Sequence, residues 1–310
     1  MKILVTGANG QVGTEMVRLA DSEFRVVGLT RGDLNIAERD AITRCLDDHE
    51  PDLLVNCAAY TAVDQAEDEP DLAYRVNADA VGWLGEACDS RGVGVIHFST
   101  DYVFDGTKHE AYVEDDIPNP LNVYGASKLE GEDRLRAATD RHLILRVSWV
   151  FGRIGRSFVD TILRLARERT ELRVVDDQVG APSPADAIAA TVRSIADRRE
   201  GLEDAWGTYH FSTVPAVSWC GFAREIVVMA MDAGILAALP RVRGIATNEW
   251  PSKAPRPPSS RLCAAKLRTF LGVAPPVWRA SLEQYLGGGA KASPIQVANL
   301  GKVTPPEACR

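Results

Sequence analysis

The 310-residue sequence lacks two features that would place it at a membrane or on nucleic acid. Its first apolar run, Ile3-Leu4-Val5 directly after Met1-Lys2, is far too short for an export signal or a membrane span. The formal net charge is −8, and a negative protein repels the phosphate backbone of nucleic acid at long range. We therefore expect a cytoplasmic protein whose partners include neither a membrane nor a nucleic acid.

Paired cysteines at CxxC spacing are also missing. The six cysteines are scattered along the chain, and without an export signal we expect them to be free thiols. The length and the 45% hydrophobic content suit one large α/β domain, or a larger domain with a smaller partner.

Short apolar runs alternate with longer amphipathic segments through the first half. Strands that are apolar throughout are covered on both faces, and repeated strand–helix alternation predicts an α/β fold with a Rossmann-type doubly wound parallel sheet. The predicted strands span residues 3–6, 25–29, 53–57, 93–99 and 142–149. The predicted helices span residues 11–19, 36–48, 72–90 and 124–138.

Three glycines at GxxGxxG spacing follow the first predicted strand and open the first helix. Gly7 permits a tight turn, Gly10 leaves room for a pyrophosphate beside the backbone, and Gly13 lets the helix pack closely on the sheet. The helix N-terminus offers unpaired N–H groups to phosphates. Strand, turn and helix together favour a dinucleotide site over a simple turn.

The second predicted strand ends in Thr30-Arg31, where an acidic residue would bind the adenosine ribose of NAD. Arg31 could pair with a 2′-phosphate, which favours NADPH, although a solvated surface arginine is the alternative. NADH is the alternative cofactor, because the acidic Asp33 lies two residues further on. Asp33 and Leu34 are also placed to contact the adenine.

A candidate reducing site follows the fourth strand, which ends in Ser99-Thr100-Asp101. Tyr124 and Lys128 are four residues apart on a predicted helix and share a face. A carbonyl that becomes an alkoxide needs a proton, and an adjacent Lys128 ammonium is expected to lower the pKa of the Tyr124 phenol toward neutral pH. Lys128 can also bond the nicotinamide ribose, and Thr100 can donate a hydrogen bond to the carbonyl oxygen. The alternative is packing for Tyr124 and a solvated Lys128.

The second half is less regular, which predicts a substrate-binding region. We assign residues 1–150 to an NAD(P)-binding Rossmann domain, 151–286 mainly to substrate binding, and 287–310 to a flexible tail. Strands near 172–175 and 209–212 are expected to return to the first domain. The other predicted helices span residues 157–169, 183–197, 218–233, 262–271 and 277–286. Residues 250–258 contain four prolines and are expected to form a loop or arm.

These motifs resemble the dTDP-4-dehydrorhamnose reductase family, within the extended short-chain dehydrogenase/reductase superfamily. The resemblance extends to about residue 285. It rests on the combination of the glycine loop with five further segments: Asn56 to Glu67, Ser99 to Gly106, Pro120 to Gly125, Arg146 to Gly152 and Asp177 to Pro182.

The resemblance implies NADPH-dependent reduction of the C4 keto group of dTDP-4-dehydro-L-rhamnose, which gives dTDP-L-rhamnose. It makes Tyr124 the proton donor and Lys128 its partner, while Thr100 and Asp101 bind the sugar. Trp149 would stack on the sugar, with a core tryptophan as the alternative. The further cofactor contacts that it implies are Gln11, Val12, Ala58, Ala59, Tyr60 and Thr61.

The sequence departs from the family at the proline arm. The family usually carries an Asn-Ser pair after Arg-Pro, whereas this chain continues from Arg256 without an asparagine. Arg256 remains a candidate for binding the nucleotide phosphates. The family is also associated with a divalent metal at a dimer contact, so Mg²⁺ and a homodimer enter as expectations. Glu15 is the one acidic residue that we can match to such a site.

Two other functions stay open. A nucleotide-sugar epimerase or dehydratase would keep the fold, but dehydratases typically carry an acidic pair after the threonine, and here Tyr102 follows Asp101. A noncatalytic nucleotide-binding regulatory subunit would not need an intact Thr100, Tyr124 and Lys128.

Overall fold

The structure is a computed structural model that describes residues 1–198, 205–272 and 274–287. Its centre is a six-stranded parallel sheet with the strand order β10-β5-β4-β3-β1-β2. This confirms the predicted doubly wound α/β fold. The strands are β1 (Lys2–Thr6), β2 (Arg25–Leu29), β3 (Leu53–Asn56), β4 (Gly94–Thr100), β5 (His142–Val147) and β10 (Gly207–His210).

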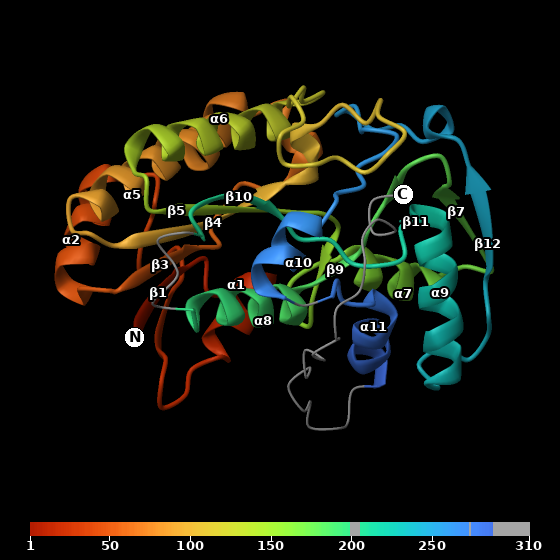
Figure 1. The fold of residues 1–310 in the computed structure, drawn as a ribbon. Helices are drawn as coiled ribbons and strands as arrows, with labels where there is room; N and C mark the ends of the chain where they lie inside the picture. The colour runs from red at the N-terminus through yellow and green to blue at the C-terminus, as the bar shows by residue number, and fades with distance from the viewer. Residues whose placement is uncertain (199–204, 273, 288–310) are drawn as a thin grey trace.

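Helices cover both faces of this sheet (Figure 1). Alternate residues of β1 point to opposite faces: Leu4 packs in one hydrophobic cluster, and Ile3 and Val5 pack in the other. One face carries α2 (Arg39–His49), α5 (Ala80–Asp89) and α6 (Val123–Ala138). The other carries α1 (Gln11–Val17), α8 (Ala185–Ala196) and α10 (Ala265–Leu271).

A third hydrophobic cluster lies beside the sheet and contains the buried Phe222 and Trp278. Its helices are α7 (Phe158–Glu168), α9 (Trp219–Asp232) and α11 (Trp278–Gly287). Three small sheets accompany them: β7 (Glu171–Val175) with β12 (Arg241–Ile245), β6 (Val150–Phe151) with β9 (Ser183–Pro184), and β8 (Val179–Gly180) with β11 (Val217–Ser218). The division of function between residues 1–150 and 151–286 stays a prediction.

The strands predicted near 172–175 and 209–212 pair in different sheets. β10 joins the main sheet beside β5, as expected. The expectation for 172–175 is wrong, because β7 pairs with β12 outside that sheet. An apolar run shows that a strand is buried, but it does not show which strand it pairs with.

The predicted helix over 72–90 is interrupted. It consists of α4 (Pro70–Tyr74), a π-helical turn η1 (Arg75–Asp79) and α5. A Cβ added to Gly131 of α6 would lie 1.9 Å from the carbonyl oxygen of Asn77, so the two helices meet backbone to backbone at this turn. Three shorter helices complete the described chain: α3 (Val63–Ala66), η2 (Asp101–Val103) and η5 (Thr247–Glu249).

Cys45, Cys57, Cys88 and Cys220 are free thiols, as expected. Cys263 is disulfide-bonded, so the expectation is wrong at that position. Residues 288–310 of the predicted tail lie outside the described residues.

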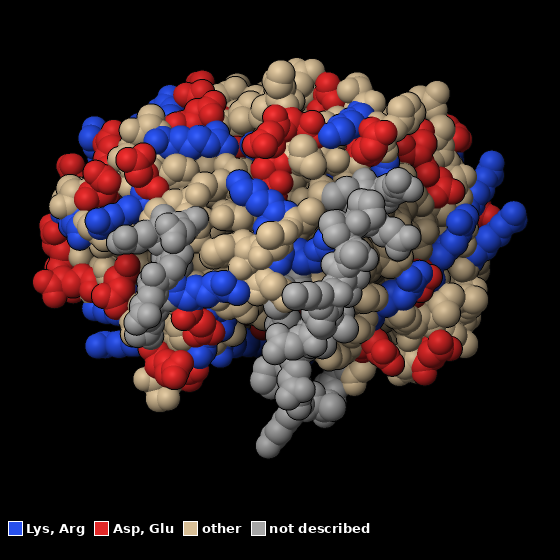
Figure 2. All heavy atoms as spheres, in the orientation of Figure 1, with Lys and Arg blue, Asp and Glu red and all other residues tan. Residues whose placement is uncertain are grey.

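Within the described chain, no helix combines the length and apolar character needed to cross a bilayer. Basic and acidic side chains are interspersed over the face that Figure 2 shows.

Candidate functional site

Thr100 and Tyr124 meet where β4 ends and α6 begins. The Asn122 side chain caps α6 by accepting a hydrogen bond from the Gly125 N–H at 2.8 Å, which places Tyr124 in the first turn. A Cβ on Gly125 would lie 2.2 Å from the Tyr102 carbonyl oxygen, so this turn lies directly against the segment after β4. The Thr100 hydroxyl lies near enough to the Tyr124 phenol to lower the pKa of that phenol.

Tyr124 is a neutral phenol in this setting. Burial raises its pKa to about 12, against a lowering by the hydrogen bond with Thr100, and the nearby Asp101 raises it further. The expected fall of this pKa toward neutral pH is therefore wrong: burial outweighs the lowering, which comes from Thr100 and not from Lys128. A neutral phenol is the form that can donate a proton.

Lys128 lies in the interior, with 2% of its surface exposed. Its Nζ donates to the Phe98 carbonyl oxygen at 2.6 Å and lies 3.0 Å from His97 Nε2. Burial lowers the pKa of Lys128 to about 8, and the charge of Glu132 opposes that shift. The ammonium therefore faces the end of β4, which rules out the alternative of a solvated lysine.

Asp101 is a buried carboxyl group next to this pair, with 3% of its surface exposed. The Thr100 hydroxyl donates to its Oδ1 at 3.0 Å. Burial raises the pKa of Asp101 to about 7, although hydrogen bonds from Ser260 and Thr100 oppose the rise. Ser260 belongs to the segment that follows the proline arm, so this segment closes one side of the site.

Asn77 ties the segment after β3 to α6. Its Oδ1 accepts from the Tyr60 N–H at 2.9 Å, and its Nδ2 donates to the Tyr60 carbonyl oxygen and to Ser127 Oγ, both at 3.0 Å. The bond to Ser127 joins two helices, so Asn77 does more than cap its own helix. Ser127 was not singled out from the sequence, although it lies between Tyr124 and Lys128.

The glycine loop has the shape that its spacing predicts. Gly7 has a φ of +63°, and a Cβ on Gly13 would lie 2.2 Å from the Gly7 carbonyl oxygen. Gly10 is exposed, Val12 is half-buried, and Gln11 Oε1 is a buried acceptor with no hydrogen-bond partner among the described residues. An open glycine turn beside an unused polar atom fits a dinucleotide pyrophosphate.

The residues expected at the nucleoside follow β2 and β3, the two neighbours of β1. Arg31 is exposed, whereas the Asp33 carboxylate accepts from the Thr30 N–H at 2.9 Å and the Thr30 hydroxyl at 2.7 Å. Leu34 is buried in a hydrophobic cluster. After β3, Ala58 and Ala59 are half-buried like Tyr60, and Thr61 is exposed. Their contacts with a cofactor stay predictions.

Trp149 has an unusual backbone and a ring partner. Its φ is +47°, a left-handed value that side chains rarely adopt, and its ring stacks on Trp219 at 3.4 Å between centroids. A Cβ on Gly180 would lie 2.6 Å from the Trp149 ring. Trp149 is half-buried, so stacking on a sugar stays a prediction. Trp219 was not anticipated, because no sequence motif connects it with Trp149.

Arg256 is held by Asp64. Its guanidinium donates to both carboxylate oxygens of Asp64, at 3.1 and 2.8 Å, and it is hydrogen-bonded to the Tyr102 side chain. Tyr102 is the neighbour of Asp101 in the sequence, so Arg256 lies close to the segment after β4. The fixed guanidinium remains a candidate for binding phosphate.

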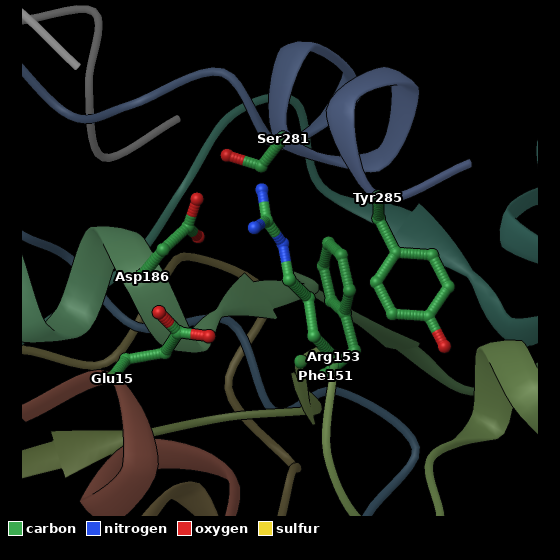
Figure 3. Close-up of a pocket in the computed structure, with 7 residues that line it drawn as sticks. Glu15, Phe151, Arg153, Asp186, Ser281 and Tyr285 are labelled. Atoms are coloured by element: carbon green, nitrogen blue, oxygen red, sulfur yellow. The ribbon is translucent and has the colours of Figure 1, made fainter. Parts of the chain in front are cut away.

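The described residues do not fit the metal that the resemblance implies. Among them, no group of three or more His, Cys, Asp or Glu side chains could hold an ion. Glu15 pairs with Arg18 at 2.6 Å, and it lines a pocket with Asp186 and Arg153. Figure 3 shows the Arg153 side chain extending into the space between these carboxylates and Ser281. A guanidinium already supplies positive charge there.

Comparison with known proteins assigns the family. Residues 1–289 match the family described as RmlD substrate binding domain. The chain belongs to this family. It is 40% identical to the dTDP-4-dehydrorhamnose reductase of Aggregatibacter actinomycetemcomitans, over 91% of this chain and 97% of that protein. It is 43% identical to the reductase of the same name from Burkholderia thailandensis, over 90% of this chain and 96% of that protein.

Solved structures of the RmlD family agree with this fold. A dTDP-4-dehydrorhamnose reductase from Clostridium acetobutylicum has a TM-score of 0.86 and 37% identity, over 92% of this chain and 98% of that one. The Bacillus anthracis reductase in complex with NADP has a TM-score of 0.85 and 33% identity, over the same shares. A UDP-glucose 4-epimerase from Thermus thermophilus is 20% identical, and that likeness shows the fold alone.

Proposed function

We propose that this chain is an NADPH-dependent reductase of the C4 keto group of dTDP-4-dehydro-L-rhamnose, and that its product is dTDP-L-rhamnose. The observation that carries the proposal is the meeting of Thr100 and Tyr124 where β4 ends, with Lys128 of the same helix buried against Phe98 and His97 of β4. The named relatives and the NADP complex of the Bacillus anthracis protein support the substrate and the cofactor.

NADPH, when bound, supplies the hydride. Tyr124 donates its phenolic proton to the C4 oxygen as negative charge develops there. When the substrate is bound, the Thr100 hydroxyl turns from Asp101, to which it donates in the structure, to the C4 oxygen, so part of the charge is shared before the proton moves. Lys128 holds the nicotinamide ribose with an N–H that its contacts with β4 leave unused.

The sequence-derived contacts complete the proposal. The glycine loop with Gln11 and Val12 binds the pyrophosphate, and Arg31 binds the 2′-phosphate. Asp33 and Leu34 lie at the adenine, and residues 58–61 flank the cofactor. On the other side, Asp101, Trp149 and Arg256 bind the sugar nucleotide. A homodimer and a cytoplasmic location remain predictions, and the proposal includes no metal.

The test follows NADPH oxidation spectrophotometrically with the dTDP-4-keto sugar, for the wild type and for Tyr124→Phe. The variant keeps the ring but lacks the proton, so we expect kcat to fall by about two to four orders of magnitude. NADH, assayed in parallel, should be the poorer cofactor if Arg31 binds a 2′-phosphate.

Equal rates for the two proteins would contradict the role of Tyr124. A wild type that binds NADPH but never oxidises it with this substrate would instead favour the regulatory-subunit alternative. An epimerase would convert the sugar without net consumption of NADPH.

A further inference from the structure

His97 is a buried titratable residue for which the reaction described above has no use. It lies on β4 with none of its surface exposed, and both of its ring nitrogens have side-chain partners. Nδ1 lies 2.9 Å from Asn56 Nδ2, and Nε2 lies 3.0 Å from Lys128 Nζ. The imidazole therefore bridges the end of β3 and the lysine of the candidate site.

These hydrogen-bonded side chains extend from Asn56 to the strand that precedes the glycine loop. Thr6 Oγ1 lies 2.6 Å from Asn56 Oδ1, and the Ala58 N–H donates to both of these oxygens, at 3.3 and 3.2 Å. Thr6 ends β1 and precedes Gly7. A row of side chains thus runs under the ends of β1, β3 and β4, from the glycine turn to Lys128.

We propose that His97 is a positioning residue for Lys128: its Nε2 accepts a hydrogen bond from the ammonium and fixes the direction of the remaining N–H toward the cofactor. The inference rests on the proposed function. An ammonium has three N–H donors, of which one goes to the Phe98 carbonyl oxygen and one to His97. One donor remains for the cofactor side.

The proposal sets the tautomer of His97. If Nε2 accepts from Lys128, a neutral imidazole carries its proton on Nδ1, and that N–H must find an acceptor on Asn56. The amide meets this requirement when Oδ1 faces the ring and Nδ2 faces Thr6 Oγ1. This orientation is the reverse of the one in the structure, and it gives up the hydrogen bonds that Asn56 Oδ1 accepts from Thr6 and from the Ala58 N–H. The Ala58 N–H keeps Thr6 Oγ1 as its acceptor. Burial and the charge of Lys128 lower the pKa of His97 well below its usual value, which keeps the ring neutral.

Other charged groups near Lys128 are already paired. Glu132, one turn further along α6, binds Arg146 of β5 at 2.7 Å. Asp79 of η1 binds Arg134 at the exposed side of α6. Asp101 after β4 is hydrogen-bonded to Thr100. Tyr124 on α6 itself is neutral. His97 is therefore the ring that faces the ammonium directly.

Two matched variants separate the contacts of His97. A glutamine side chain can place its amide near the Nε2 position, facing Lys128, whereas the shorter asparagine reaches only the Nδ1 position, facing Asn56. For His97→Asn we expect kcat to fall by roughly ten- to a hundredfold, the usual effect of losing a hydrogen bond to a charged group. His97→Gln should retain most of the rate. Thermal unfolding of both variants controls for a general loss of structure.

The pH profile gives a readout that a structural defect would not move. Losing the acceptor disfavours the ammonium, so the alkaline fall of kcat should begin at lower pH in His97→Asn than in the wild type or His97→Gln. NMR titration of ¹³C-labelled lysines, without substrate, should give Lys128 a lower pKa in His97→Asn than in the wild type and in His97→Gln. In ¹⁵N-histidine spectra of the wild type near neutral pH, we expect His97 to be protonated on Nδ1.

The measurements distinguish a failure of the role of His97 from a failure of the proposed function. Equal kcat values, pH profiles and Lys128 titrations in both variants, or a proton on Nε2 while Lys128 is charged, would overturn the role of His97. A wild type that reduces no 4-keto sugar would overturn the proposed function, and the NMR measurements would still decide whether His97 binds the Lys128 ammonium.

Discussion

Tyr124 stays protonated throughout the neutral range, because burial raises its pKa to about 12. Reduction needs a proton donor, so this shift favours the direction in which a carbonyl becomes an alcohol. Lys128, whose pKa burial lowers to about 8, is the group that loses its charge first as the pH rises. The alkaline limit of activity therefore belongs to Lys128, not to the phenol.

Asp101 should make the stability of the protein depend on pH. Its pKa rises from 3.8 to about 7 on folding, so the folded state binds more protons than the unfolded state between these values. The free energy of unfolding then falls as the pH rises through this window. Asp101→Asn removes the effect. In urea denaturation, we expect the free energy of unfolding of the variant, relative to that of the wild type, to rise by up to about 4 kcal/mol from pH 4 to pH 8.

A constant difference between the two proteins across that range would contradict the buried, proton-retaining state of Asp101. The comparison uses the same two proteins at each pH, so a fixed cost of the substitution cancels from the change.

At the scale of elements, the contact between α6 and the π-helical turn η1 holds the site together. Gly131 allows the contact, since its Cβ would lie 1.9 Å from the Asn77 carbonyl oxygen. Asn77 in turn fixes Tyr60 and Ser127. The positions of Asn77 on η1 and of Ser127 on α6 therefore depend on the close approach of these two backbones.

Gly131→Ala should separate these helices. We expect the free energy of unfolding to fall by about 1–3 kcal/mol, the usual cost of overpacking, and kcat to fall with it because Tyr124 and Lys128 lie on α6. Denaturant unfolding and the NADPH assay measure the two effects. Gly32→Ala is the control, because its Cβ would meet nothing closer than 3.6 Å. Unchanged stability in Gly131→Ala would contradict a close backbone contact between α6 and η1.

The elements also show what a sequence can predict. The central sheet followed from the alternation of apolar and amphipathic runs, because parallel strands are covered on both faces. The break at η1 was not predicted; the turn packs against Gly131, more than fifty residues further along, and a local pattern does not show that contact. The pairing of β7 with β12 was missed for a similar reason: strand partners are set by the folded chain, not by local composition.

At the scale of the whole molecule, distant segments converge on the ends of the parallel strands. Residues after β1, β2 and β3 form the expected cofactor side, and the segment after the proline arm reaches Asp101 through Ser260. Val179 of β8 joins that segment by backbone hydrogen bonds with Pro258 and Ser260, next to the Gly180 that packs on Trp149. This arrangement agrees with the rule that ligands of open α/β sheets bind at the carboxyl ends of the strands.

The candidate site was predictable where a local motif carried the chemistry, as for the glycine loop, Thr100, Tyr124 and Lys128. It was not predictable where one side chain acts on another from a different strand. His97 belongs to no spacing motif, nothing in the segment that begins at Asn56 connects it with His97, and Trp219 meets Trp149 across seventy residues. The direction of the Tyr124 pKa shift depended on burial, which the sequence does not give.

Transfer of a deuterium label tests the central claim most directly. The enzyme is supplied with NADPH deuterated at the transferable position and with the dTDP-4-keto sugar, and the product is examined by NMR. The proposed reduction predicts that deuterium appears on C4 of the sugar, with one NADPH consumed per product. A product without deuterium at C4, or conversion without consumption of the cofactor, would contradict it.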